Sequence, residues 1–162
     1  MKPMGIILAS ASPRRRQLLE LVNLPFEVVP SSSEDAPRAD EQPAEYALRA
    51  AREKALDVAH RHCNKPVLGA DTVVEIEGRI LGKPSSAGDA REMLKALSGR
   101  RHLVHTALAL VARSECSSVI DTTEVCFLPL DEAVIRWYVP VSYTHLRAHE
   151  TVLVISYDVF CL

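Results

Sequence analysis

The stretch LASASPRRR, residues 8–16, decides how the chain begins to fold and where its first candidate site lies. It joins an apolar run at Gly5–Ala9, which is typical of a buried strand, to a helical pattern from Pro13 to about Val22. Ser12 is a favourable N-cap residue, and Pro13 is a favourable first residue of a helix. The stretch therefore predicts a strand that turns directly into a helix.

The first turn of this helix carries three arginines, Arg14, Arg15 and Arg16. Positive charge is unfavourable there, because the helix dipole is already positive at its N-terminus and the first N–H groups have no partners. A bound anion removes this cost, since the dipole, the N–H groups and the guanidinium groups then all point at it. The residues alone leave two interpretations open, a phosphate site or a solvated basic turn on a surface helix.

Composition is that of an ordinary single-domain globular protein, with 162 residues of which 48% are hydrophobic and 25% charged. A net charge of −2 and an aromatic content of 5% argue against a nucleic-acid partner. No apolar run approaches membrane-spanning length, and the N-terminus lacks the apolar core of a signal peptide. The four cysteines are scattered. We therefore expect a cytoplasmic protein with reduced thiols and without a membrane partner.

Periodicity and turn residues predict the remaining elements. The expected strands are 26–29, 66–76, 79–81, 102–111 and 118–127, and the expected helices are 43–62, 86–97 and one that opens at 129–131. Leu18, Leu19 and Val22 should give the first helix a stripe that faces the core. In the helix of residues 43–62 a face of small residues should pack on a sheet, while the charged residues Arg49, Arg52, Glu53 and Asp57 should be mostly outward.

Four features carry candidate chemistry. Asp71 stands inside an apolar strand, where a carboxylate is expensive to bury unless it is paired, hydrogen-bonded or bound to a metal; a strand-end cap is the alternative. Lys54 lies at the margin of an apolar helix face, and Lys83 is held on a rigid loop between Gly82 and Pro84. The pair Glu34-Asp35 follows a strand end and is either part of a site or a solvated acidic turn.

Taken together, five ordered motifs resemble those of the Maf family of nucleoside triphosphate pyrophosphatases. In chain order they are residues 9–15, 26–30 with the acidic pair that follows, 51–55, 69–74 with 82–84, and 97–106. The resemblance covers residues 4–139. It implies an α/β fold of the Maf/ITPase type, a curved mixed β-sheet flanked by helices with a central cleft and with its C-terminal part missing.

The resemblance also implies an activity, the hydrolysis of a nucleoside triphosphate to the monophosphate and pyrophosphate, which cleans the nucleotide pool. The implied cofactor is a divalent metal ion, Mg²⁺ or Mn²⁺, and the full-length protein is expected to be a homodimer. Asp71 would be the general base that activates water and would also bind the metal with the pair Glu34-Asp35. The family more often has Asp before Glu at that pair, so which of the two carboxylates contacts the metal stays open.

The substrate-binding residues follow from the same motifs. Ser12, Arg15, Lys54 and Lys83 would hold the phosphates. Arg14 and Thr72 correspond to positions that distinguish the subfamilies, and this combination is similar to the dTTP/UTP type. The 7-methyl-GTP type carries Trp and Gln there, so it is the less favoured enzyme alternative. A non-catalytic nucleotide-binding regulator linked to septum formation is the alternative from another class.

The match to the family's motifs ends after Val139. The segments that the family has next, among them an Asp-Lys-Ala-Gly motif, have no counterpart in residues 140–162. We therefore expect an incomplete Maf-like domain at 1–139 and a non-native tail at 140–162. We expect the chain as written to be weakly active or inactive.

Overall fold

The computed structural model describes residues 5–33, 36–62, 64–113 and 115–146, with side chains as far as Val139. The chain divides into two compact units. The first consists of Met1–Thr72 and His105–Thr122, and the second of Val73–Val104 and Thr123–Leu162.

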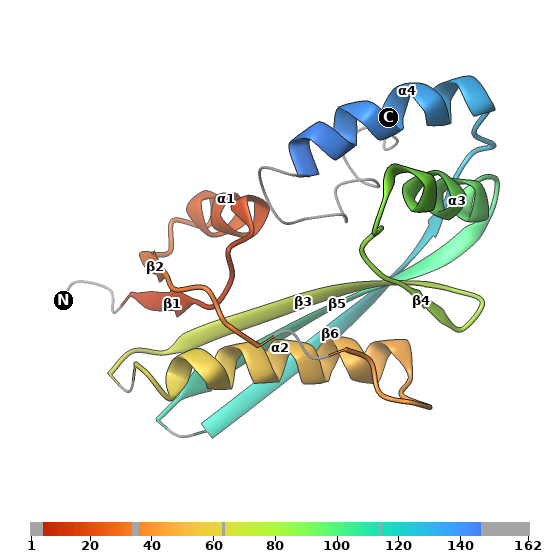
Figure 1. The fold of residues 1–162 in the computed structure, drawn as a ribbon. Helices are drawn as coiled ribbons and strands as arrows, with labels where there is room; N and C mark the ends of the chain where they lie inside the picture. The colour runs from red at the N-terminus through yellow and green to blue at the C-terminus, as the bar shows by residue number, and fades with distance from the viewer. Residues whose placement is uncertain (1–4, 34–35, 63, 114, 147–162) are drawn as a thin grey trace. The chain divides into compact units, whose positions relative to one another are not determined.

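The elements alternate between strands and helices (Figure 1). They are β1 (Ile6–Leu8), α1 (Pro13–Leu21), β2 (Phe26–Val28), α2 (Pro43–Ala59), β3 (Val67–Ile76), β4 (Arg79–Leu81), α3 (Ala87–Leu97), β5 (Arg101–Ala112), β6 (Glu115–Cys126) and α4 (Glu132–Leu146). The sheet has six strands in the order β2-β1-β3-β5-β6, with β4 paired to β3. The mixed α/β fold expected from the family resemblance is confirmed, whereas the central cleft stays a prediction.

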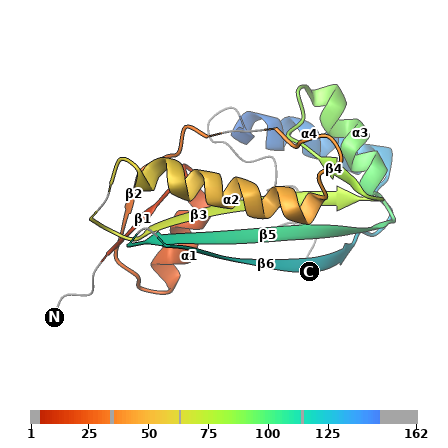
Figure 2. The same ribbon diagram turned by 90° about the horizontal axis from the view of Figure 1, so that it is seen from below.

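The first unit is built around β1, which pairs in parallel with β2 on one side and β3 on the other. Ile7 lies opposite Glu27 and Val67, and both Ile7 and Leu8 are buried. Helix α2 runs along one face of the sheet, and α1 lies on the opposite side of β1 (Figures 1 and 2). Strands β1 and β3 therefore run in the same direction, and β1 leads into the turn before α1.

The contact between α2 and β3 is close because small residues meet there. Ala47, Ala51 and Ala55 are fully buried on α2, which confirms the predicted face of small residues. Opposite them stands Gly69 of β3, where a Cβ would overlap the Ala51 carbonyl and lie 2.7 Å from the Ala55 nitrogen. Glycine is therefore required at this position by close approach of the helix, not by its backbone conformation.

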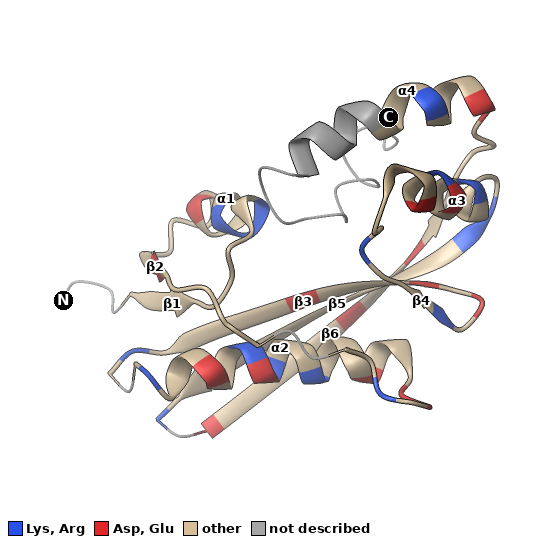
Figure 3. Cartoon of the chain, in the orientation of Figure 1, with Lys and Arg blue, Asp and Glu red and all other residues tan. Residues whose placement is uncertain are grey.

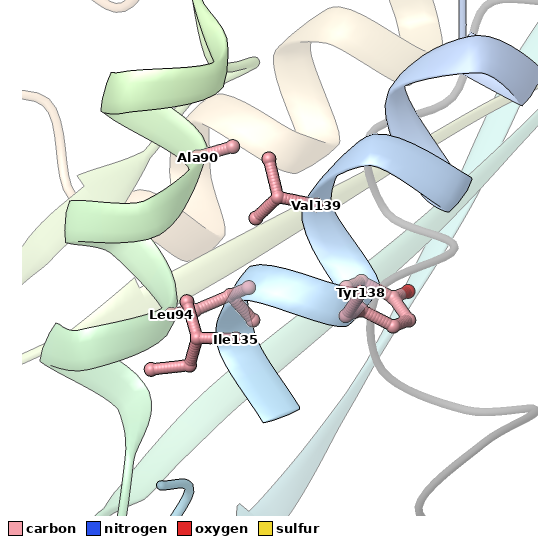
Figure 4. Close-up of a cluster of buried hydrophobic side chains, with 5 residues drawn as sticks. All are labelled: Ala90, Leu94, Ile135, Tyr138 and Val139. Atoms are coloured by element: carbon pink, nitrogen blue, oxygen red, sulfur yellow. The ribbon is translucent and has the colours of Figure 1, made fainter. Parts of the chain in front are cut away.

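The second unit contains the β3–β4 hairpin and two packed helices. Glu77 and Gly78 form the predicted turn with φ values of 50° and 76°. At the start of α3 the Ser86 Oγ accepts a hydrogen bond from the Asp89 N–H at 3.1 Å, as the capping pattern predicts. Side chains of α3 and α4 then interdigitate in a small core (Figure 4). Its buried members are Ala90, Leu94, Ile135, Tyr138 and Val139.

One sequence prediction about a helix is wrong, and the extent of another helix is new. Helix α1 buries none of its residues, and Leu18 and Val22 are 56% and 67% exposed, so its apolar stripe does not face a core. Helix α4 does not end where the family motifs end but continues through Pro140 to Leu146. Within the described ranges, none of the helices combines the length and apolar character that crossing a membrane requires.

Candidate active site

The turn between β1 and α1 is organised by Ser10, a residue that sequence reasoning did not select. Its hydroxyl is almost buried and accepts two hydrogen bonds, from the Ser12 N–H at 3.2 Å and from Arg15 Nη1 at 3.0 Å. Ser12 occupies the N-cap position of α1, but its side chain makes no cap hydrogen bond. The signal that could have identified Ser10 is its place directly after a buried strand, where its hydroxyl can bridge the turn and the helix.

The first turn of α1 carries basic residues and no acidic residue (Figure 3). Burial lowers the pKa of Arg15, and the negative charge of Asp71 acts in the opposite direction. The charge of Asp71 on β3 thus acts on Arg15, which comes from α1. An arginine remains charged at neutral pH despite such a shift.

Asp71 is paired directly with Lys54. The Lys54 ammonium on α2 lies 2.5 Å from the Asp71 Oδ1, and the two side chains are 23% and 13% exposed. This pairing explains how an otherwise apolar strand accommodates a carboxylate. Tyr46, two turns before Lys54 on the same helix, also experiences this carboxylate, because burial and then the charge of Asp71 raise the pKa of its phenol.

The structure therefore brings together one carboxylate and two cationic side chains from three different elements, α1, α2 and β3. Such a group can hold a polyphosphate through the cations while the carboxylate orients a water molecule. Carboxylate oxygen is the donor type that Mg²⁺ and Mn²⁺ prefer, so Asp71 fits a metal-binding role in its chemistry. Within the ranges that the structure describes, no three His, Cys, Asp or Glu side chains gather around a common point.

The residues predicted from the sequence are distributed over both units. Six belong to the first unit, namely Ser12, Arg14, Arg15, Lys54, Asp71 and Thr72. Lys83 follows β4 in the second unit, and its place in the site stays a prediction. Glu34 and Asp35 lie outside the described residues, so their metal role also stays a prediction. Among the first six, Lys54 and Asp71 are in direct contact, and the charge of Asp71 acts on Arg15.

Arg49 and Asp57 differ from the prediction that they point outward. The Arg49 side chain is only 14% exposed because it is surrounded by Glu41, Glu53 and the carbonyl of Ala36. The carboxylate of Asp57 accepts hydrogen bonds from Ser31 and Ser32. Periodicity could not reveal this, because the partners lie in a polar loop with no pattern of its own.

Comparison with known proteins agrees with the fold and the motifs. The family described as "Maf-like protein" matches residues 5–147, past the boundary at Val139 that the motifs suggested. A solved structure, the Ham1 protein of Staphylococcus aureus, aligns with a TM-score of 0.51 at 18% identity, covering 75% of this chain and 71% of that one. At that identity the likeness concerns the fold alone.

Curated relatives are much more similar in sequence. The dTTP/UTP pyrophosphatase of Bacillus mycoides is 46% identical over 134 residues, which is 83% of this chain and 70% of the relative. Those of Bacillus cytotoxicus and Syntrophus aciditrophicus are 47% and 46% identical, over 82% and 83% of this chain and 70% and 66% of their own lengths. With a family match that extends over most of its length, the chain belongs to the Maf family.

Proposed function

We propose that the protein hydrolyses nucleoside triphosphates, with dTTP and UTP preferred, to the monophosphate and pyrophosphate. The observation that carries this proposal is the Lys54–Asp71 pair with Arg15 nearby, in a chain 46% identical to a dTTP/UTP pyrophosphatase. A water molecule oriented by the Asp71 carboxylate attacks the α-phosphorus, and the bond to the oxygen that bridges the α- and β-phosphates breaks. Asp71 takes the proton from that water, and pyrophosphate leaves.

The cations and the start of α1 supply charge neutralisation for this reaction. Arg15 and Lys54 pair with phosphate oxygens, and Ser12 with the first N–H groups of α1 adds hydrogen bonds. Lys83 completes the phosphate-binding set in this proposal. A divalent ion, Mg²⁺ or Mn²⁺, would be held by Asp71 with Glu34 or Asp35 and would neutralise charge on the phosphates. Arg14 and Thr72 would select the pyrimidine substrates.

Two further properties belong to the same proposal. A cytoplasmic location suits an enzyme whose substrates are the free nucleoside triphosphates of the cell. A homodimer for the full-length protein is supported by the family resemblance.

Release of pyrophosphate from dTTP, UTP and 7-methyl-GTP, measured with Mg²⁺, tests the activity. We expect release from dTTP and UTP that exceeds release from 7-methyl-GTP and is lost in Asp71→Asn. Binding of dTTP without turnover, unchanged in Asp71→Asn, would favour the nucleotide-binding regulator instead. The same assay tests the expectation of weak activity, because turnover equal to that of the Bacillus mycoides relative would contradict it.

A further inference from the structure

The side chains of Lys54 and Asp71 neutralise each other. Within the described ranges, the Lys54 ammonium donates a single hydrogen bond, to the Asp71 Oδ1 at 2.5 Å, and the second carboxylate oxygen accepts none. The two side chains are 23% and 13% exposed, so solvent reaches both groups but screens their attraction less than it would at an open surface. The cation proposed to bind phosphate is therefore already paired with the carboxylate proposed as the base.

Arg15 is held in a different way. Its Nη1 donates to the Ser10 Oγ at 3.0 Å, and Ser10 is almost buried. The charge of Asp71 acts on Arg15, but in the part of the chain that the structure describes no hydrogen bond joins the two side chains. A lysine also carries its charge on a flexible four-carbon stem, whereas the guanidinium is a planar group fixed here by a neighbour. Of the two cations, Lys54 is therefore the one that can change its partner.

The first turn of α1 starts close to the strand that carries Asp71. Strands β1 and β3 are parallel neighbours, and the Ala9 N–H donates to the Leu68 carbonyl at 2.8 Å. Leu68 precedes Asp71 by three residues on β3. A phosphate bound by the first N–H groups of α1 would therefore lie beside this strand, and its negative charge would compete with the carboxylate for Lys54.

We propose that a bound polyphosphate draws Lys54 away from Asp71, so that the carboxylate becomes free only when the phosphates are in place. The inference rests on the proposed function, in which Arg15 and Lys54 bind the phosphates. A polyphosphate carries several negative charges against the single charge of the carboxylate, so it attracts the ammonium more strongly. A carboxylate that loses its cation where it is only 13% exposed favours a new counter-ion, and the proposed divalent ion would supply it.

Binding of inorganic pyrophosphate in the presence of EDTA, measured by calorimetry, tests the competition without metal or turnover. Asp71→Asn removes the competing charge, so the Kd for pyrophosphate should fall about tenfold, which is within the range of coupling between residues in direct contact. Lys54→Gln should raise the Kd. Adding Asp71→Asn to Lys54→Gln should then lower the Kd much less than it does in the presence of Lys54, because no lysine is left to release.

Glu27→Gln is the matched control. Glu27 pairs with Lys65 at 2.8 Å in the same unit, so this substitution also removes one negative charge and separates one lysine from its carboxylate. Neither residue belongs to the proposed site. The Kd for pyrophosphate should therefore equal that of the wild type, and a tenfold fall in Glu27→Gln would contradict the inference.

A second measurement does not depend on Lys54→Gln, which leaves the Asp71 carboxylate without a cation and is expected to destabilise the fold. The ¹⁵N NMR signal of the Lys54 ammonium, assigned by its absence in Lys54→Arg, should differ between the wild type and Asp71→Asn when both are free. In saturating pyrophosphate the two signals should converge, because Lys54 no longer contacts residue 71.

An equal gain from Asp71→Asn with and without Lys54 would overturn the inference, because charge repulsion alone would then explain it. Ammonium signals that stay as far apart in pyrophosphate as without it would also overturn it, as would a wild type and Asp71→Asn that both bind no pyrophosphate. Failure of the proposed function gives a different result. If no triphosphate is hydrolysed with Mg²⁺ but the coupling is found, the exchange of Lys54 stands and the proposed activity fails. If dTTP is hydrolysed and the coupling is absent, the activity stands and the exchange fails.

Discussion

At the scale of single residues, Ser10 holds the Arg15 side chain at the start of α1. Ser10→Ala leaves Arg15 Nη1 and the Ser12 N–H without their acceptor in a place that is 8% exposed. We expect the free energy of unfolding to fall by about 1–3 kcal/mol, the cost of unsatisfied buried donors. The KM for dTTP should rise as well, because the guanidinium is no longer held. Urea denaturation and steady-state kinetics measure the two effects.

The control for this prediction is Ser12→Ala. The Ser12 hydroxyl makes no cap hydrogen bond, so its removal should change the free energy of unfolding much less than Ser10→Ala does. Equal losses in the two variants would show that the hydrogen bonds of Ser10 do not stabilise the turn.

The ion pair of Asp71 shows what residue-level sequence reasoning can reach. Burying a charge is costly, so the sequence predicts that a carboxylate in this apolar strand needs a partner. The structure confirms this prediction, because Asp71 pairs with Lys54. The sequence does not predict which cation pairs with Asp71. Lys54 is 17 residues away, and its position in the helix indicated only that it lies at the edge of an apolar face. The pairing depends on how α2 lies on the sheet, which no local pattern contains.

At the scale of elements, the contact between α2 and β3 depends on Gly69. In Gly69→Ala the new Cβ would meet the backbone of Ala51 and Ala55, and backbone atoms cannot move aside as a flexible side chain can. We expect a loss of about 1–3 kcal/mol in the free energy of unfolding, the usual cost of overpacking, or more if α2 cannot shift. Because α2 carries Lys54, the variant should also lower activity.

Gly82→Ala provides the comparison for this substitution. A Cβ at Gly82 would have no atom within 4 Å, so that variant should unfold at nearly the wild-type denaturant concentration. A stable Gly69→Ala protein would mean that the helix can move away from the sheet without loss.

The sequence predicted helix starts and turns that are set by local residues. It predicted less well which faces and side chains are buried, because burial depends on a partner far away in the chain. The capping pattern at Ser86 and the turn at Glu77-Gly78 are local, and both are confirmed. The apolar stripe of α1 was predicted to be buried because periodicity reports a face but not what covers it. For the same reason Arg49 was assigned to solvent, although a loop without periodicity encloses it.

At the scale of the whole molecule, the candidate site could be predicted only through the family motifs. Arg15, Lys54 and Asp71 come from three elements separated by long stretches of sequence, and only the order of the motifs connected them in advance. The net charge and the composition argued against a nucleic-acid or membrane partner, but they indicated no substrate. The conformation of the loops could not be predicted either. It depends on hydrogen bonds to side chains such as Asp57, which the sequence pattern does not distinguish from a solvent-exposed residue.

The pH dependence of stability is also a property of the whole molecule, and below neutral pH three of the shifted groups act in one direction. Burial lowers the pKa of His102, which is 3% exposed and meets the edge of Phe127 at a centroid distance of 4.9 Å. Hydrogen bonds from Arg49 lower the pKa of Glu41 to about 2, and those from Ser32 and Ser31 lower the pKa of Asp57 to about 2. In each case the unfolded chain binds a proton more readily than the folded one, so stability must rise with pH.

We therefore expect the free energy of unfolding to fall in two steps as the pH is lowered. The first begins near the ordinary histidine value of 6.5, because His102 must remain neutral in the fold while the unfolded chain becomes protonated. The second extends from the ordinary glutamate value of 4.5 down to about 2, where Glu41 and Asp57 are protonated and the β2–α2 connection is released.

Urea unfolding at a series of pH values tests this with two variants. His102→Gln has no titrating group at that position, so it should reduce the slope between about pH 7 and pH 5 whatever its absolute stability. Glu41→Gln should leave that slope unchanged and reduce only the acid step. A His102→Gln slope equal to that of the wild type would contradict the first assignment. At pH 5 the carboxylates of Glu41 and Asp57 are still ionised, so hydrogen exchange in residues 31–33 and 36–41 should remain slow although His102 has begun to lower the overall stability.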